Sequence, residues 1–118
     1  MSVMHWRSIR LELGKTKQFP AGSVSRAYLV NLPLDDFDAV DGAALAQSPS
    51  RATVRRYWST EPDEHGRMVA SGSAWAIRCD GKPDRLLRLN GTPMRLGQEV
   101  SVVDPDGNVL PLKVASVR

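Results

Sequence analysis

Apolar and polar residues alternate with a period of two through most of this chain of 118 residues. The clearest case is residues 6–13, where Ile9, Leu11 and Leu13 share one face and the side chains between them are polar. Successive side chains of a β-strand point to opposite faces, so this pattern is typical of a half-buried strand. A chain built on such a period is expected to fold mainly as β-structure.

Further β-type runs follow at short intervals along the chain. They cover residues 25–32, 51–60, 68–79, 86–89, 99–103 and 109–117. Segments rich in Gly, Pro and Asp separate them, at residues 14–22, 61–67, 80–84 and 104–108. This rhythm predicts a mainly β fold, a small antiparallel barrel or sandwich of about seven strands with one short helix. The length suits one core, so we expect residues 1–118 to form a single domain.

The central hairpin is expected to join residues 51–60 and 68–79 through a loop at 61–67. A symmetric loop would place Trp58 opposite Ala70, and Arg55 within reach of Trp75. Small residues at 71–73 interrupt the second run, which suggests a bulge or a close approach by another backbone.

The C-terminal hairpin has the clearest turn chemistry. Pro105 presets the first turn position and Gly107 accepts the positive φ that closes the turn. Leu110, Leu112 and Val114 form one apolar face of the strand that follows. In turn chemistry alone, this segment resembles the closing hairpin of many small barrels.

Residues 35–47 are the one segment without the strand period. Asp41 is well placed to cap a short helix that runs through Gln47 and ends at Ser48-Pro49. This is the only helix we expect. Its apolar face would contain Phe37, Val40, Ala44 and Leu45.

Metal and cofactor sites are disfavoured by spacing. Asp35, Asp36, Asp38 and Asp41 cluster, but an EF-hand loop that starts at Asp36 would need Gly at its sixth position and Glu at its twelfth, where Asp41 and Gln47 stand. We interpret these aspartates as turn and cap residues. No Walker loop or dinucleotide-binding glycine pattern occurs, so we assign no metal and no cofactor.

The single cysteine, Cys79, excludes an internal disulfide and any zinc site built on paired cysteines. It ends an apolar run, and we expect it to be a small buried hydrophobe.

Catalytic residues are not assigned. His5 and His65 are the only histidines, one near a terminus and one in the expected loop, where side chains are usually solvated. A small enzyme remains the third hypothesis. It would need a concave pocket that holds one histidine with two carboxylates.

A stretch rich in Arg and aromatic residues is the candidate binding surface, made of Arg51, Arg55, Arg56, Trp58, Trp75 and Arg78. Arg and Trp are prominent in protein interfaces, so our leading hypothesis is a non-enzymatic binding module that takes a protein partner or associates with itself. The alternative is a single-stranded nucleic-acid binder, compatible with a pI near 9.4. The competing structural interpretation places both tryptophans in the core, with Arg55 stacked on Trp75.

Localisation rests on what the chain lacks. No apolar run approaches the roughly 20 residues of a membrane-spanning helix, and residues 1–7 do not resemble a secretory signal. We therefore expect a soluble, cytoplasmic protein without a membrane partner.

Overall fold

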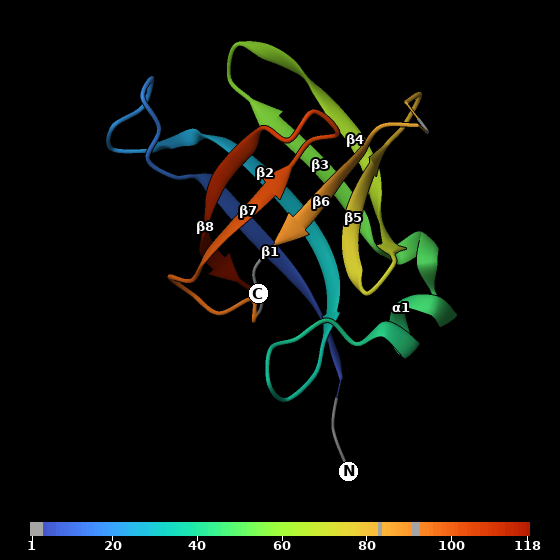
Figure 1. Cartoon of the computed structure of the whole chain (residues 1–118). Coiled ribbons are helices and arrows are strands. Elements are labelled where there is room, and N and C mark those ends of the chain that lie inside the picture. The colour runs from blue at the N-terminus through green and yellow to red at the C-terminus, as the bar shows by residue number, and fades with distance from the viewer. Residues whose placement is uncertain (1–3, 83, 91–92) are drawn as a thin grey trace.

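The computed structural model describes residues 4–82, 84–90 and 93–118, and its strands close into an antiparallel barrel of eight strands (Figure 1). Pro83, in the expected turn at 80–84, lies outside the described residues. Each strand pairs with the next along the chain, and β8 pairs with β1. The mainly β, antiparallel fold is confirmed, and a barrel replaces the open choice between barrel and sandwich. The strands are β1 (His5–Leu13), β2 (Ser23–Leu34), β3 (Thr53–Trp58), β4 (Glu61–Ser71), β5 (Ala74–Cys79), β6 (Leu86–Asn90), β7 (Glu99–Val103) and β8 (Val109–Val117).

The period of two determines which side chains fill the barrel. Ile9 on β1 pairs with Val30 on β2, which pairs with Val54 on β3, and all three are buried. The same inward alternation continues where β8 closes the barrel against β1, and there Leu11 pairs with Val114. An eight-stranded barrel is just wide enough for its inward side chains to meet, and here they form one hydrophobic cluster.

The central hairpin differs from the expectation in register and in strand number. Residues 61–67 are not a loop but belong to β4, and Trp58 lies opposite Glu61 instead of Ala70. Gly66 contributes to the turn signal of residues 61–67 in the sequence. It marks a close approach between strands instead, because a Cβ there would collide with the carbonyl oxygen of Arg78.

The eighth strand comes from the run at 68–79, which was expected to be a single strand. The small residues at 71–73 are not a bulge but a turn between β4 and β5, with Gly72 at a φ of 60°. Glycine adopts this left-handed conformation without a steric penalty, so the chain can reverse here.

The expected helix is confirmed as α1 (Gly42–Gln47). The Asp41 carboxylate accepts a hydrogen bond of 3.0 Å from the backbone N–H of Ala44, as a helix cap does. A short 3₁₀ helix, η1 (Pro49–Arg51), follows it. Phe37 does not join the buried face but is 72% exposed, because the Asp35 carboxylate holds residues 35–39 in a separate turn before the helix. No helix in the described part of the chain is long and apolar enough to cross a membrane.

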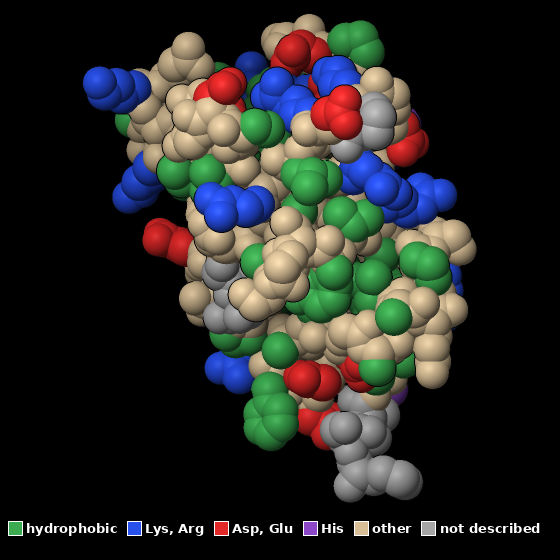
Figure 2. Space-filling model, turned by 45° about the vertical axis from the view of Figure 1, so that its right-hand side comes forward, with side chains coloured by type: hydrophobic (Ala, Val, Ile, Leu, Met, Phe, Trp, Pro, Cys, Tyr) green, Lys and Arg blue, Asp and Glu red, His purple; other side chains and the backbone are tan. Residues whose placement is uncertain are grey.

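The two ends of the barrel differ. At the lower end in Figure 1, α1 lies between β2 and β3 in the chain and covers the barrel, with Leu45 and Met94 buried. The β1–β2, β3–β4, β5–β6 and β7–β8 connections lie at the upper end, which we call the mouth, and their described residues form no helix. Charged side chains of both signs gather at this end (Figure 2).

Candidate functional site

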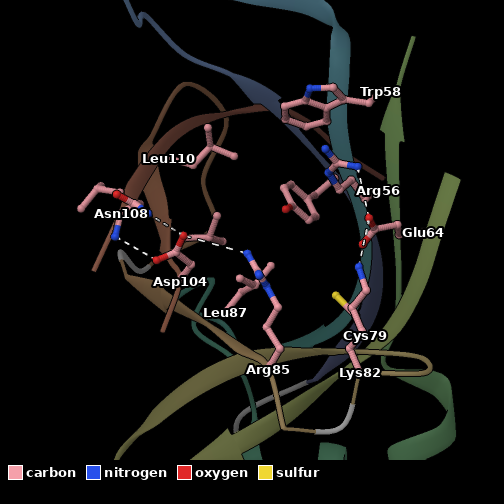
Figure 3. A pocket seen from close by; sticks show the side chains of 13 residues that line it. Arg56, Trp58, Glu64, Cys79, Lys82, Arg85, Leu87, Asp104, Asn108 and Leu110 are labelled. Carbon is pink, nitrogen blue, oxygen red and sulfur yellow. Dashed lines mark hydrogen bonds and ion pairs between the residues drawn. The ribbon is translucent and has the colours of Figure 1, made fainter. Parts of the chain in front are cut away.

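A pocket of about 390 Å³ opens at the mouth, within the range of small-molecule sites. The apolar wall is formed by Leu87, Val102 and Leu110, which continue the inward faces of β6, β7 and β8. Polar and aromatic side chains from β2, β3, β4 and the mouth turns form the remainder (Figure 3). The barrel interior is therefore filled below and hollow at one end.

Arg56 points into the barrel because it shares the parity of Val54, which is buried two residues earlier on β3. Its guanidinium lies 4.3 Å from the ring centroid of Trp58. It also makes ion pairs of 3.0 Å with Glu61 and 3.5 Å with Glu64. With a side chain only 19% exposed, this arginine has its charge balanced by two carboxylates and one aromatic face.

Tyr28 lies opposite Arg56 on β2 and is 4% exposed. Its ring meets Trp58 edge to face, with 6.2 Å between ring centroids. Burial raises the pKa of Tyr28 to about 12, while the neighbouring Arg56 guanidinium acts in the opposite direction. The phenol is thus a neutral group of the pocket wall at physiological pH.

The opposite wall is built around Asp104, in the β7–β8 turn. Its carboxylate accepts hydrogen bonds from the Asn108 side chain at 3.0 Å and from the backbone N–H groups of Asn108 and Asp106, each at 2.9 Å. Hydrogen bonds from Asn108, first from the side chain and then from the backbone, lower the pKa of Asp104. Arg85 approaches this carboxylate at 4.0 Å.

Cys79 lines the same pocket, is 9% exposed and belongs to the hydrophobic cluster. Its expected role as a buried hydrophobe is confirmed. Burial raises the pKa of its thiol, so the group is protonated at neutral pH.

The six residues proposed from sequence do not form one surface. Only Arg56 and Trp58 reach the mouth pocket. Arg55 faces outward and binds Asp63 at 2.7 Å, so its expected contact with Trp75 is wrong, as follows from the altered register. Arg51 stacks on Trp6, 4.5 Å from the ring centroid.

The remaining two proposed residues lie on β5 and face different ways. Trp75 is inward, opposite Leu89, and its ring lies beside Gly42 of α1 at the lower end. Arg78 is exposed and faces outward opposite Arg67. All three tryptophans, Trp6, Trp58 and Trp75, are partly buried and packed against the core.

Several pocket residues are not among the six proposed from the sequence, namely Tyr28, Glu64, Lys82, Arg85, Asp104 and Asn108. A signal for one of them, Asp104, was present. Val100 and Val102 alternate inward on β7, and the next residue of that parity is Asp104. Arg56 follows Val54 in the same way. A polar residue that continues an inward apolar series marks the point where a barrel interior becomes a mouth.

The histidines are not brought together. His5 and His65 are both exposed, on β1 and β4, with β2 and β3 between them. His65 borders a separate depression on the outer face, whose described lining residues include Arg10 and Arg55 but no Asp or Glu. Among the described residues there is also no group of three or more His, Cys, Asp or Glu side chains placed to hold a metal ion.

Comparisons of the chain with protein-family models, with curated proteins and with solved structures found no match. The geometry of the mouth pocket is therefore the basis for the functional argument.

Proposed function

We propose that this chain is a non-enzymatic binding module whose ligand is a small molecule held in the mouth pocket. The observation that carries the proposal is the change in the barrel interior, which is packed around Leu11 and Met68 but leaves about 390 Å³ open beside Leu110. Ligand pockets are mostly apolar with a few converging polar groups, and this one combines an apolar wall with Arg56 and Tyr28. The proposal keeps the hypothesis of a binding module and moves its site from the hairpin surface to the barrel mouth.

The experiment uses N-phenylnaphthylamine, an uncharged aromatic probe whose fluorescence rises when it leaves water. We expect saturable binding to the unmodified chain. Leu110→Trp should weaken binding by about tenfold or more, because the larger ring occupies pocket volume at the rim. Leu96→Trp is the matched control, since it makes the same change at a residue that is 72% exposed and does not line the mouth pocket. Equal binding by both variants would contradict the proposal.

A second measurement needs no substitution in the apolar wall. Cys79 lines the pocket, so bound probe should slow the modification of its thiol by a maleimide. Unchanged modification at saturating probe would count against a ligand in this pocket even if Leu110→Trp failed to fold.

A second candidate function, single-stranded nucleic-acid binding, is supported by the outer face. Arg67 and Arg78 lie directly opposite each other on β4 and β5, and Arg88 is a diagonal neighbour on β6. None of the three forms an ion pair within the described residues. Like charges directly opposite one another destabilise a sheet, and a polyanion would relieve that repulsion. Its signature would be affinity for a mixed oligonucleotide that falls steeply as salt rises.

A further inference from the structure

Two cationic side chains extend from a single turn into the opening of the mouth pocket. Lys82 and Arg85 both belong to the β5–β6 connection, and they point toward different walls of the pocket (Figure 3). Lys82 lies 3.8 Å from Glu64, and Arg85 lies 4.0 Å from Asp104. Both separations are at the outer limit for an ion pair, and the two side chains are 57% and 52% exposed. Such exposed, long pairs contribute little to stability, so either cation can turn to a ligand at small cost.

The carboxylates beside them are already engaged. Asp104 accepts three hydrogen bonds within its own turn, and Glu64 is shared between Arg56 and Lys82. A cationic ligand would have to compete with these donors. An anionic ligand would instead find two weakly held cations, one on each side of the opening.

The surfaces next to these cations are apolar. Leu87 follows Arg85 by two residues and is buried, and Val102 and Leu110 extend the same wall. A ligand that reached both regions would carry its charge at the rim and its apolar part inside the barrel.

We propose that the ligand of the mouth pocket is a small amphipathic organic anion, whose charged group lies between Lys82 and Arg85 and whose apolar part contacts Leu87, Val102 and Leu110. This inference rests on the proposed function, because it assigns a chemical class to the ligand of the same pocket. Charge-assisted hydrogen bonds from the two side chains supply selectivity for the anion, and the apolar wall supplies affinity that a neutral analogue shares.

The test compares two probes that share an aromatic framework. Anilinonaphthalenesulfonate is N-phenylnaphthylamine with one added sulfonate, so the difference in their dissociation constants measures recognition of the anion. We expect the sulfonate to bind the unmodified chain about tenfold more tightly at low salt. Lys82→Gln and Arg85→Gln should each weaken sulfonate binding by about threefold to tenfold, and should leave binding of the neutral probe within about twofold.

Arg78→Gln is the matched control, because it removes a cation from the outer face of β5, away from the pocket. It should leave the affinity for both probes unchanged. If Arg78→Gln weakened sulfonate binding as much as Arg85→Gln, general surface charge would explain the preference and the inference would be wrong.

The two proposals fail in different ways. If both probes bind equally and the glutamine variants change neither affinity, the anion assignment is overturned while the pocket retains its proposed function. If neither probe binds the unmodified chain, the proposed function fails and the anion assignment fails with it.

Discussion

Tyr28 and Arg56 show how position on a strand decides the chemistry of a side chain. The two residues are cross-strand partners that face into the barrel. Both line the mouth pocket, which lies directly above the packed core. Arg55, one residue earlier, faces outward and is 48% exposed at its side chain. Neighbours in sequence therefore belong to different environments, one enclosed and one solvated.

The raised pKa of Tyr28 makes stability depend on pH in the alkaline range. The unfolded phenol ionises near pH 10, whereas the folded one keeps its proton until about pH 12. Between these values the folded state binds the extra proton, so the free energy of unfolding should fall by about 1.4 kcal/mol per pH unit. This contribution is complete below pH 10 and is lost as pH rises through about 12.

Urea unfolding of the unmodified chain and of Tyr28→Phe, measured at several pH values across this range, isolates the effect. Phenylalanine has no ionisable group, so the difference between the two unfolding free energies should narrow or reverse in favour of Phe as pH rises. A difference that stays constant with pH would show that Tyr28 ionises equally easily in both states.

The sequence indicates which residue types line the pocket better than it indicates which residues contact one another. Arg56 and Trp58 are two of the predicted binding residues, and both line the pocket. They stand out in the sequence because Arg and Trp are prominent in binding interfaces. Lys82 and Arg85 were not separated from other basic residues, since their role depends on where the β5–β6 turn lies relative to β4 and β7. That relation is a tertiary one, and no spacing along the chain encodes it directly.

At the scale of elements, glycine is used in two physically different ways in β4 and in the turn after it. Gly66 lies inside β4 where β5 approaches closely, whereas Gly72 occupies a turn with a positive φ and open space around it. Sequence alone does not separate these uses, because both glycines are flanked by polar residues. This ambiguity explains why the sequence predicts a loop at 61–67, and a bulge or a close backbone approach at 71–73, where the structure has the turn.

Alanine substitutions should distinguish the two glycines. Gly66→Ala places a Cβ against the carbonyl oxygen of Arg78 and should destabilise the chain by about 3 kcal/mol, since the backbone of β5 would have to move. Gly72→Ala meets no neighbour and should cost about 1 kcal/mol, the strain of a left-handed alanine. Chemical denaturation of both variants gives the comparison, and a larger loss for Gly72→Ala would contradict the assigned roles.

The patterns that were predicted well are those that local chemistry determines. Asp41 caps α1 as expected, and Gly107 closes the β7–β8 turn at a φ of 87°. In each case the decisive contacts lie within a few residues of each other, so the sequence carries them without knowledge of the fold.

At the scale of the whole molecule, β1 and β8 are adjacent and antiparallel. Ser8 and Arg118 exchange backbone hydrogen bonds of 2.8 and 2.9 Å, from the N–H of each residue to the carbonyl oxygen of the other. Barrel closure was one of two options at the sequence level, because strand count and turn spacing are compatible with a sandwich as well. The choice depends on the pairing of the most distant strands, which alternation alone does not specify.

The adjacency predicts that the chain tolerates circular permutation. The permutant joins Arg118 to Met4 through a Gly/Ser linker of about eight residues and is opened at Gly72. It should keep the β-sheet circular dichroism spectrum and the probe affinity, because both changes lie away from the mouth. Loss of the β-sheet spectrum in this permutant would contradict the prediction.

A second permutant, with the same linker but opened within residues 104–108, is the matched comparison. It interrupts the turn that holds Asp104 beside the pocket, so it should fold but bind the probes more weakly. Equal affinity in the two permutants would show that the β7–β8 turn does not shape the pocket.

The pairing of β1 with β8 can form only late in translation. A ribosome must complete the first seven strands before residues 109–117 emerge from the exit tunnel, and until then β1 lacks its second neighbour. The nascent chain therefore carries an open row of N–H and C=O groups along β1. This row can be paired only after residues 109–117 have emerged.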